Sequence, residues 1–117
     1  MTTENTSTPA AAPDATMLLE APTILAACAD PVRYEILREL VKGKPFSVNE
    51  LSARLKRAPD GISKHLRVLR EARVLVTVAS PDGDGRKQVQ QIPPPLCIRD
   101  AAGRPALDFG VLVLRFD

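Results

Sequence analysis

The chain is 117 residues long, carries a formal net charge of +2 and contains only four aromatic residues. This length supports one modest domain with a single hydrophobic core. Scarce aromatic rings disfavour a binder of single-stranded nucleic acid, which stacks bases on such rings. No apolar run approaches the roughly 20 residues that span a bilayer.

Positive charge is concentrated in the middle of the chain. Residues 1–29 contain three acidic residues and no Lys or Arg, and residues 91–117 contain three of each sign. Residues 30–90 contain 13 Lys or Arg and eight acidic residues, a net charge of +5. Such an excess suits a polyanion-binding surface, although an ordinary solvated surface would carry it equally well.

The first 29 residues divide into a tail and a helix. Residues 1–15 are rich in Thr, Ala and Pro and are expected to be a disordered tail. They show neither the basic nor the apolar region of a signal peptide, so we expect a cytoplasmic protein. Residues 17–29 are mostly apolar at helical spacing, and Pro22 either breaks this helix or marks its true start.

Local capping signals predict a second helix. Asp30 is a favourable N-cap residue and Pro31 suits the first helical position. Gly43 and Pro45 are expected to end this helix.

A third and a fourth helix follow closely. Ser47 and Glu50 have the spacing of a capping box, which predicts the start of the third helix. The fourth helix is expected to begin at Pro59 and to run to about Ala72.

The rest of the chain has the pattern of strands. Residues 74–79 are predicted to form a strand, residues 81–85 a Gly- and Asp-rich turn, and residues 86–92 the returning strand of a wing. After a stiff spacer at residues 93–95, two more strands are expected around a turn at residues 102–104.

The expected fold class is α+β and mainly α. A winged helix-turn-helix, with about four helices and a two-stranded wing, is expected over residues 16–92. An extra C-terminal β-hairpin is expected over residues 93–117. Because this hairpin and the first helix carry more apolar surface than one small domain should expose, we expect both to serve in dimerisation.

The fourth helix has an apolar and a polar face. Ile62, Leu66 and Leu69 fall on one side and are predicted to face the core. In helix-turn-helix proteins the N-terminal residues of this helix meet base edges and later residues meet phosphates. The residues expected at base edges are Asp60, Gly61, Ser63 and Lys64. Those expected at phosphates are Arg67 and Arg70, and further positive charge brackets the same surface at Lys56, Arg57, Arg86 and Lys87.

The polar face of this helix also fits a role without DNA contact. An amphipathic helix with a merely solvated charged face has the same residue pattern, and Asp60 would also suit the positive end of the helix dipole. His65, the single histidine, is expected to pack at the edge of the core and is a poor metal site by itself.

The stretch from Asp30 to Ile92 resembles the arsenical-resistance-repressor (ArsR) type of winged helix-turn-helix regulators. The matching pieces are A-D-P-x-R-x-x-I-L from Ala29 to Leu37, S-V-x-E-L-S from Ser47 to Ser52, and I-S-K-H-L-R-V-L-R-E-A from Ile62 to Ala72. The resemblance implies a homodimeric transcriptional regulator, often released from DNA by a metal ion or another signal.

Three departures from this family matter. The C-x-C pair of many metal-responsive members is replaced by Val48-Asn49, so no metal is expected. Arg73 stands where the family usually has Gly, in a position that favours a left-handed backbone. The family's C-terminal dimerisation helix is replaced by prolines and strands, so its dimer geometry does not carry over.

The sequence therefore predicts a DNA-binding transcriptional regulator, a repressor that acts as a homodimer on double-stranded DNA, without a cofactor and without a membrane. The alternative is a winged-helix module that binds protein instead of DNA. An enzyme is disfavoured because no phosphate-binding loop, zinc-protease motif or nucleophile elbow is present, and no catalytic residue is expected.

Cys28 and Cys97 are the chain's two cysteines. Each is expected either to be a small buried apolar residue or to form a thiol switch with the other. A duplex-DNA titration under oxidant and under reductant distinguishes these possibilities.

Overall fold

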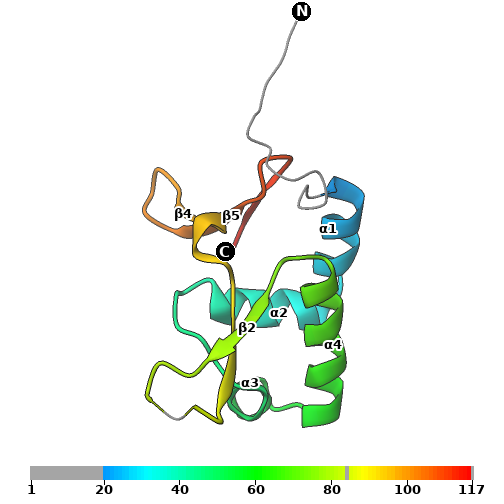
Figure 1. Ribbon diagram of the computed structural model, residues 1–117. Coiled ribbons are helices and arrows are strands. Elements are labelled where there is room, and N and C mark those ends of the chain that lie inside the picture. Colours follow the sequence, from blue (N-terminus) through cyan, green and yellow to red (C-terminus); the bar gives the residue numbers. More distant parts are fainter. Residues whose placement is uncertain (1–19, 84, 117) are drawn as a thin grey trace, which may run out of the picture.

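The computed structural model describes residues 20–83 and 85–116 (Figure 1). The tail expected over residues 1–15 lies outside this part. The elements in chain order are the helices α1 (Ala21–Cys28), α2 (Pro31–Leu40), α3 (Val48–Leu55) and α4 (Pro59–Glu71), the strands β2 (Val76–Ala79) and β3 (Gln88–Gln91), the short 3-10 helix η3 (Pro94–Leu96), and the strands β4 (Cys97–Arg99), β5 (Pro105–Asp108) and β6 (Val113–Arg115).

The helices begin where the capping chemistry predicts. The Asp30 carboxylate accepts hydrogen bonds from the backbone N–H groups of Val32 and Arg33, at 2.8 and 3.1 Å, and so caps α2. Ser47 and Glu50 form the predicted capping box of α3, with bonds of 2.8 and 3.1 Å. Pro22 marks the start of α1, so the helix is short and not kinked.

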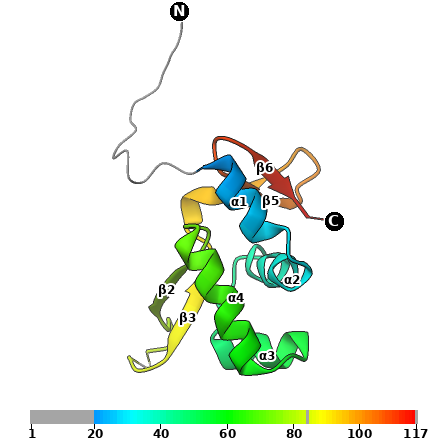
Figure 2. The same ribbon diagram turned by 90° about the vertical axis from the view of Figure 1, so that its right-hand side faces the viewer.

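One hydrophobic core joins the helices. Ile36 and Leu37 of α2, Leu51 of α3, and Leu66 and Leu69 of α4 are completely buried. Figure 2 shows α4 with α3 at its N-terminal end and α1 near its C-terminal end. The core therefore holds α4 against every other helix and leaves its opposite face exposed.

The wing is an antiparallel pair of strands that is shorter than the sequence predicted. Ala79 pairs with Gln88, and Val76 pairs with Gln91. Val74 and Leu75, which were expected in the first strand, are buried in the core instead, at 0% and 2% exposure. The side chains of these two residues pack on the helical core, so the two residues do not pair with β3 in the wing.

The C-terminal segment is a three-stranded sheet in the order β4-β5-β6, not the expected hairpin. The predicted turn between its first two strands is present, since Gly103 N–H donates to the Asp100 carbonyl at 2.8 Å. The predicted second strand is broken by a further turn, in which the Asp108 carboxylate accepts from Gly110 N–H and Gly110 has φ +84°. The expected proline spacer is a 3-10 turn, η3.

This sheet packs on the end of the molecule that lies away from the wing tip (Figure 1). The same hydrophobic core as that of the helices includes Leu107, Phe109 and Phe116. The ring centroids of Phe116 and Tyr34 lie 5.3 Å apart. The expected boundary at residue 93 stays a prediction. Within the described ranges, no helix has the length and apolar character needed to cross a membrane.

Candidate nucleic-acid interface

The exposed face of α4 is mostly polar, and Val68 is an exposed apolar residue near its C-terminal end. Its buried face consists of Ile62, Leu66 and Leu69, which pack into the core as predicted. The side chains expected at base edges lie on the exposed face, and so do the two arginines expected at phosphates. These exposed residues are Asp60, Gly61, Ser63, Lys64, Arg67 and Arg70.

Hydrogen bonds fix the backbone conformation of the turn between α3 and α4. Lys56 adopts a left-handed conformation with φ 56° and ends α3. Arg57 N–H then donates to the Ser52 carbonyl at 3.1 Å, and the Ser52 hydroxyl donates to the Arg57 carbonyl. Pro59 starts α4 immediately afterwards. These contacts fix the angle at which α4 leaves α3, and they place Lys56 and Arg57 beside its N-terminus.

The cations of this region differ in how far they are neutralised. Lys56 and Lys64 are exposed and contact no carboxylate among the residues that the structure describes. Arg57 lies 3.5 Å from a carboxylate oxygen of Glu35, and Arg67 lies 3.8 Å from one of Glu71. Because exposed ion pairs of this kind contribute little, both arginines are available to a competing anion.

Lys87 is engaged within the protein. Its Nζ atom lies 3.1 Å from Glu50 Oε2 and 3.8 Å from Asp82 Oδ2, which ties the wing to the N-terminus of α3. The pKa of Glu50 is lowered, chiefly by the hydrogen bond from the Ser47 N–H and next by Lys87. Its neighbour Arg86 is exposed on the wing. DNA contact by either residue stays a prediction.

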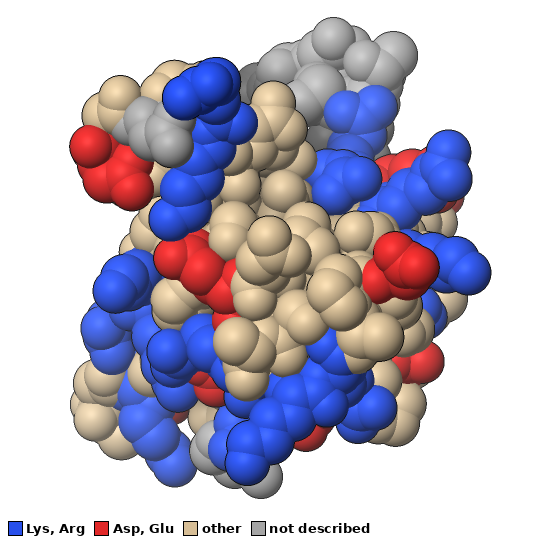
Figure 3. Space-filling view, turned by 90° about the horizontal axis from the view of Figure 1, so that it is seen from below, with Lys and Arg blue, Asp and Glu red and all other residues tan. Residues whose placement is uncertain are grey.

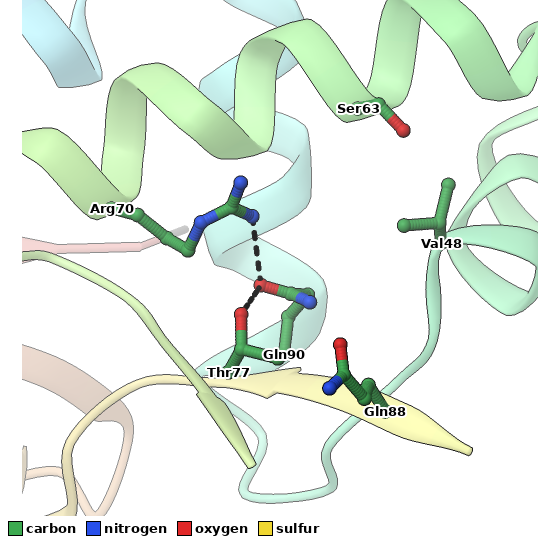
Figure 4. A pocket seen from close by; sticks show the side chains of 6 residues that line it. All are labelled: Val48, Ser63, Arg70, Thr77, Gln88 and Gln90. Carbon is green, nitrogen blue, oxygen red and sulfur yellow. Dashed lines mark hydrogen bonds between the residues drawn. The ribbon is translucent and has the colours of Figure 1, made fainter. Parts of the chain in front are cut away.

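Arg70 is directed towards the wing. Its Nη1 atom donates to Gln90 Oε1 at 3.2 Å, and Thr77 donates to the same oxygen at 3.0 Å (Figure 4). Gln90 is only 4% exposed. Sequence reasoning missed this buried residue, because three glutamines in a four-residue strand suggest a solvated surface.

His65 is held between α1, α2 and α4. Its Nδ1 atom accepts from Arg33 Nη1 at 3.1 Å, and it lies 3.9 Å from Asp30 Oδ1. Arg33 also donates to the Ala27 carbonyl at the end of α1, at 2.6 Å. The histidine therefore packs at the core boundary, as the sequence predicted.

Basic side chains gather on the end of the molecule that carries α3 and the wing tip. Figure 3 shows this end from below, with Lys and Arg over much of its left and lower parts and acidic side chains scattered between them. A surface of this kind attracts the phosphate backbone of nucleic acid.

Comparison with known proteins agrees with this geometry. A family described as a helix-turn-helix domain matches residues 29–78. An ArsR-like transcriptional regulator from Rhodococcus sp. RHA1 superposes with a TM-score of 0.56 at 28% identity, covering 63% of this chain and 65% of that chain. The chain thus has the fold and the sequence pattern of ArsR-type winged helix-turn-helix regulators.

Two further solved structures resemble the chain. Reduced HlyU from Vibrio cholerae N16961 has a TM-score of 0.54 at 29% identity, covering 62% of this chain and 70% of HlyU. Rv0081 of M. tuberculosis has a TM-score of 0.53 at 29% identity, covering 68% of this chain and 74% of Rv0081. A search of curated proteins by sequence gives no match. The class is one of transcription regulators and not of enzymes.

The two cysteines lie at the edge of the core. Cys28 and Cys97 are free and half-buried, and burial raises the pKa of Cys28 to about 11 and also raises that of Cys97. A raised pKa lowers the thiolate fraction, so both are poor nucleophiles in this state. A redox role for them stays a prediction. Across residues 20–83 and 85–116, no three His, Cys, Asp or Glu side chains gather as a metal site.

Proposed function

We propose that this ArsR-type regulator is a repressor that binds double-stranded DNA as a homodimer. The α4 helix enters the major groove, and the wing rests on the neighbouring backbone or minor groove. Asp60, Gly61, Ser63 and Lys64 face the bases or the nearest backbone, while Lys56, Arg57, Arg67 and Arg86 face phosphates. The protein acts in the cytoplasm and needs no metal or cofactor for binding.

The observation that carries this proposal is the unneutralised positive charge on the exposed face of α4. Lys64 lies in the second turn of the helix, and Lys56 lies in the turn before it. Neither has an ionic partner among the described residues, so neither has to give one up when it meets a phosphate or a guanine.

A titration of duplex DNA at several salt concentrations tests this function. A protein with several phosphate contacts should lose about 10³-fold or more in affinity between roughly 50 and 200 mM salt. Lys64→Glu should abolish binding. The control is Arg99→Glu, which makes the same charge change on β4, far from α4, and should leave binding intact. An affinity for duplex DNA that does not change with salt concentration, or that is unchanged in Lys64→Glu, overturns the proposal.

A second candidate is a winged-helix module that binds protein. Exposed apolar side chains favour it, notably Leu25 at 57% and Val111 at 56% exposure. Under this alternative, Lys64→Glu and Arg67→Glu leave partner binding unchanged, whereas Leu25→Asp weakens it. Selection of bound sequences from random duplex DNA separates the two, because only the first function enriches a sequence.

A further inference from the structure

A polar hollow of about 460 Å³ lies between α4 and the wing (Figure 4). Ser63 and Arg70 line it from α4, Thr77 lines it from β2, and Gln88 and Gln90 line it from β3. Val48 of α3 closes one side. Among the described residues that form its wall, none is acidic. The hollow therefore presents one full positive charge, with no carboxylate to oppose it.

Gln90 is the buried member of this wall. Its Oε1 atom accepts from both Arg70 and Thr77. Because a guanidinium has no acceptor, the amide oxygen must face Arg70, and the amide nitrogen must face the other way. Figure 4 shows this nitrogen on the side towards Val48, at the edge of the hollow.

The Gln90 amide nitrogen donates to no described residue, although the side chain is only 4% exposed. Buried donors are normally paired, and leaving one unpaired costs free energy. An acceptor that enters the hollow would satisfy this donor.

Further donors converge on the same space. The Ser63 hydroxyl points into the hollow from α4, and Gln88 reaches it from β3, two residues before Gln90 and on the same face of the strand (Figure 4). Neither side chain bonds to another described residue. Arg70 adds N–H groups beyond the one that Gln90 accepts. Hydroxyl, amide and guanidinium donors around one point are what a phosphate group requires.

We propose that this hollow binds one backbone phosphate of duplex DNA. The proposal rests on the proposed function, because Ser63 precedes Lys64 on the face assigned to DNA. It changes one expectation: Ser63, expected at a base edge, binds phosphate instead. Gln90 binds the phosphate through its nitrogen and, through its oxygen, holds Arg70 in place.

Two glutamine-to-glutamate variants test this proposed phosphate site. Gln90→Glu keeps an oxygen for Arg70 and Thr77, but it removes the free N–H and adds a negative charge. Gln88→Glu changes an exposed residue on the same face, so its folding is not at risk. Each should weaken binding to a random-sequence duplex by about tenfold and lower the slope of log affinity against log salt by about 0.9, the value for one phosphate.

Gln91→Glu is the matched control. It introduces the same charge one residue along, on the opposite face of β3, and should change affinity by less than about threefold. If the unmodified protein binds no duplex, the proposed function fails as a whole. The unmodified protein could instead bind duplex DNA with the expected salt dependence, while Gln88→Glu and Gln90→Glu have the same affinity and salt slope as Gln91→Glu. In that case only the proposed phosphate site is wrong.

NMR distinguishes a DNA phosphate from a free anion. Addition of a short duplex should shift the side-chain amide signals of Gln88 and Gln90, while inorganic phosphate at the same phosphate concentration should leave them in place. Shifts with inorganic phosphate and none with the duplex would show that the hollow takes a free anion, which overturns the proposal.

Discussion

Gly61 has no structural reason to be glycine in the free protein. It lies on the exposed face of α4, and a Cβ atom there would meet nothing within 4 Å. Because Gly is less favourable than Ala inside a helix, Gly61→Ala should raise the free energy of unfolding by about 1 kcal/mol in a urea titration. The same methyl group would separate the helix backbone from the bases, so affinity for the selected DNA site should fall. Unchanged affinity would rule out a close approach at this residue.

Arg73 ends α4 in a strained conformation. Its φ is 66°, and it occupies the glycine position of a Schellman motif, in which Arg73 N–H donates to the Arg70 carbonyl and Val74 N–H to the Leu69 carbonyl. A left-handed backbone costs a residue with a Cβ atom about 1 kcal/mol or more. Arg73→Gly should therefore be about 1 kcal/mol more stable than Arg73→Ala.

Both Arg73 variants lose the arginine side chain and its contacts. Their difference in thermal or urea unfolding therefore isolates the backbone. Equal stability would show that this turn relaxes at no cost.

Among the single residues, those of α4 followed from the sequence and Gln90 did not. Helical periodicity alone places Ile62 in the core and Lys64 on the surface. Gln90 is buried because Phe46 pairs with it through two backbone hydrogen bonds, of 3.1 and 2.7 Å, and because Arg70 reaches across from α4. Those contacts come from distant parts of the chain, so no local pattern reveals them.

At the scale of elements, the start of α3 is tied to the wing through Glu50. Its carboxylate accepts from Ser47 N–H and from Lys87, and both lower its pKa from the ordinary value of 4.5. A carboxyl group whose pKa is lower in the folded state stabilises the fold above the pKa of the unfolded chain, and this contribution is lost as pH falls through the folded value. The stability from this contact is thus complete above about pH 4.5 and declines below it.

Urea unfolding at neutral and at acid pH tests this dependence. The protein should lose stability between about pH 5 and 3, and Glu50→Gln should lose less over that range because it starts without the ionised contact. Lys87→Met, which keeps the capping box but removes the ion pair, should give an intermediate loss. A Glu50→Gln variant as acid-sensitive as the original chain would show that Glu50 is not a source of the effect.

The elements that capping residues define were predicted well, and those that depend on pairing were not. Asp30, Ser47 and Pro59 act on the backbone within three residues, so the starts of α2, α3 and α4 could be found from sequence. The limits of the wing depend on which residues the helical core covers. The third C-terminal strand depends on a turn at Asp108 and Gly110, which apolar alternation through residues 105–116 conceals.

At the scale of the whole molecule, the DNA-facing features and the two most exposed large apolar side chains occupy different ends. α3, the start of α4 and the wing tip lie at one end, while α1 and the strands β5 and β6 lie together at the other (Figures 1 and 2). Leu25 of α1 is 57% exposed, Val111 before β6 is 56% exposed, and Val113 of β6 is 43% exposed. Exposed apolar side chains on elements at one end of the molecule suit contact with a second copy of the chain.

We therefore expect dimerisation through this end, with the two α4 helices left free for DNA. Leu25→Asp and Val111→Asp should each shift the protein from dimer to monomer in sedimentation at micromolar concentration, because each would bury a carboxylate in an apolar contact. Val76→Asp is the control, since Val76 is 39% exposed on the wing and should leave the mass unchanged. A symmetric dimer reads two half-sites about 34–36 Å or a multiple of that apart, so the monomeric variants should also lose preference for a palindromic duplex over a single half-site. An unmodified chain that sediments as a monomer, or variants that keep both the dimer and the palindrome preference, would contradict this arrangement.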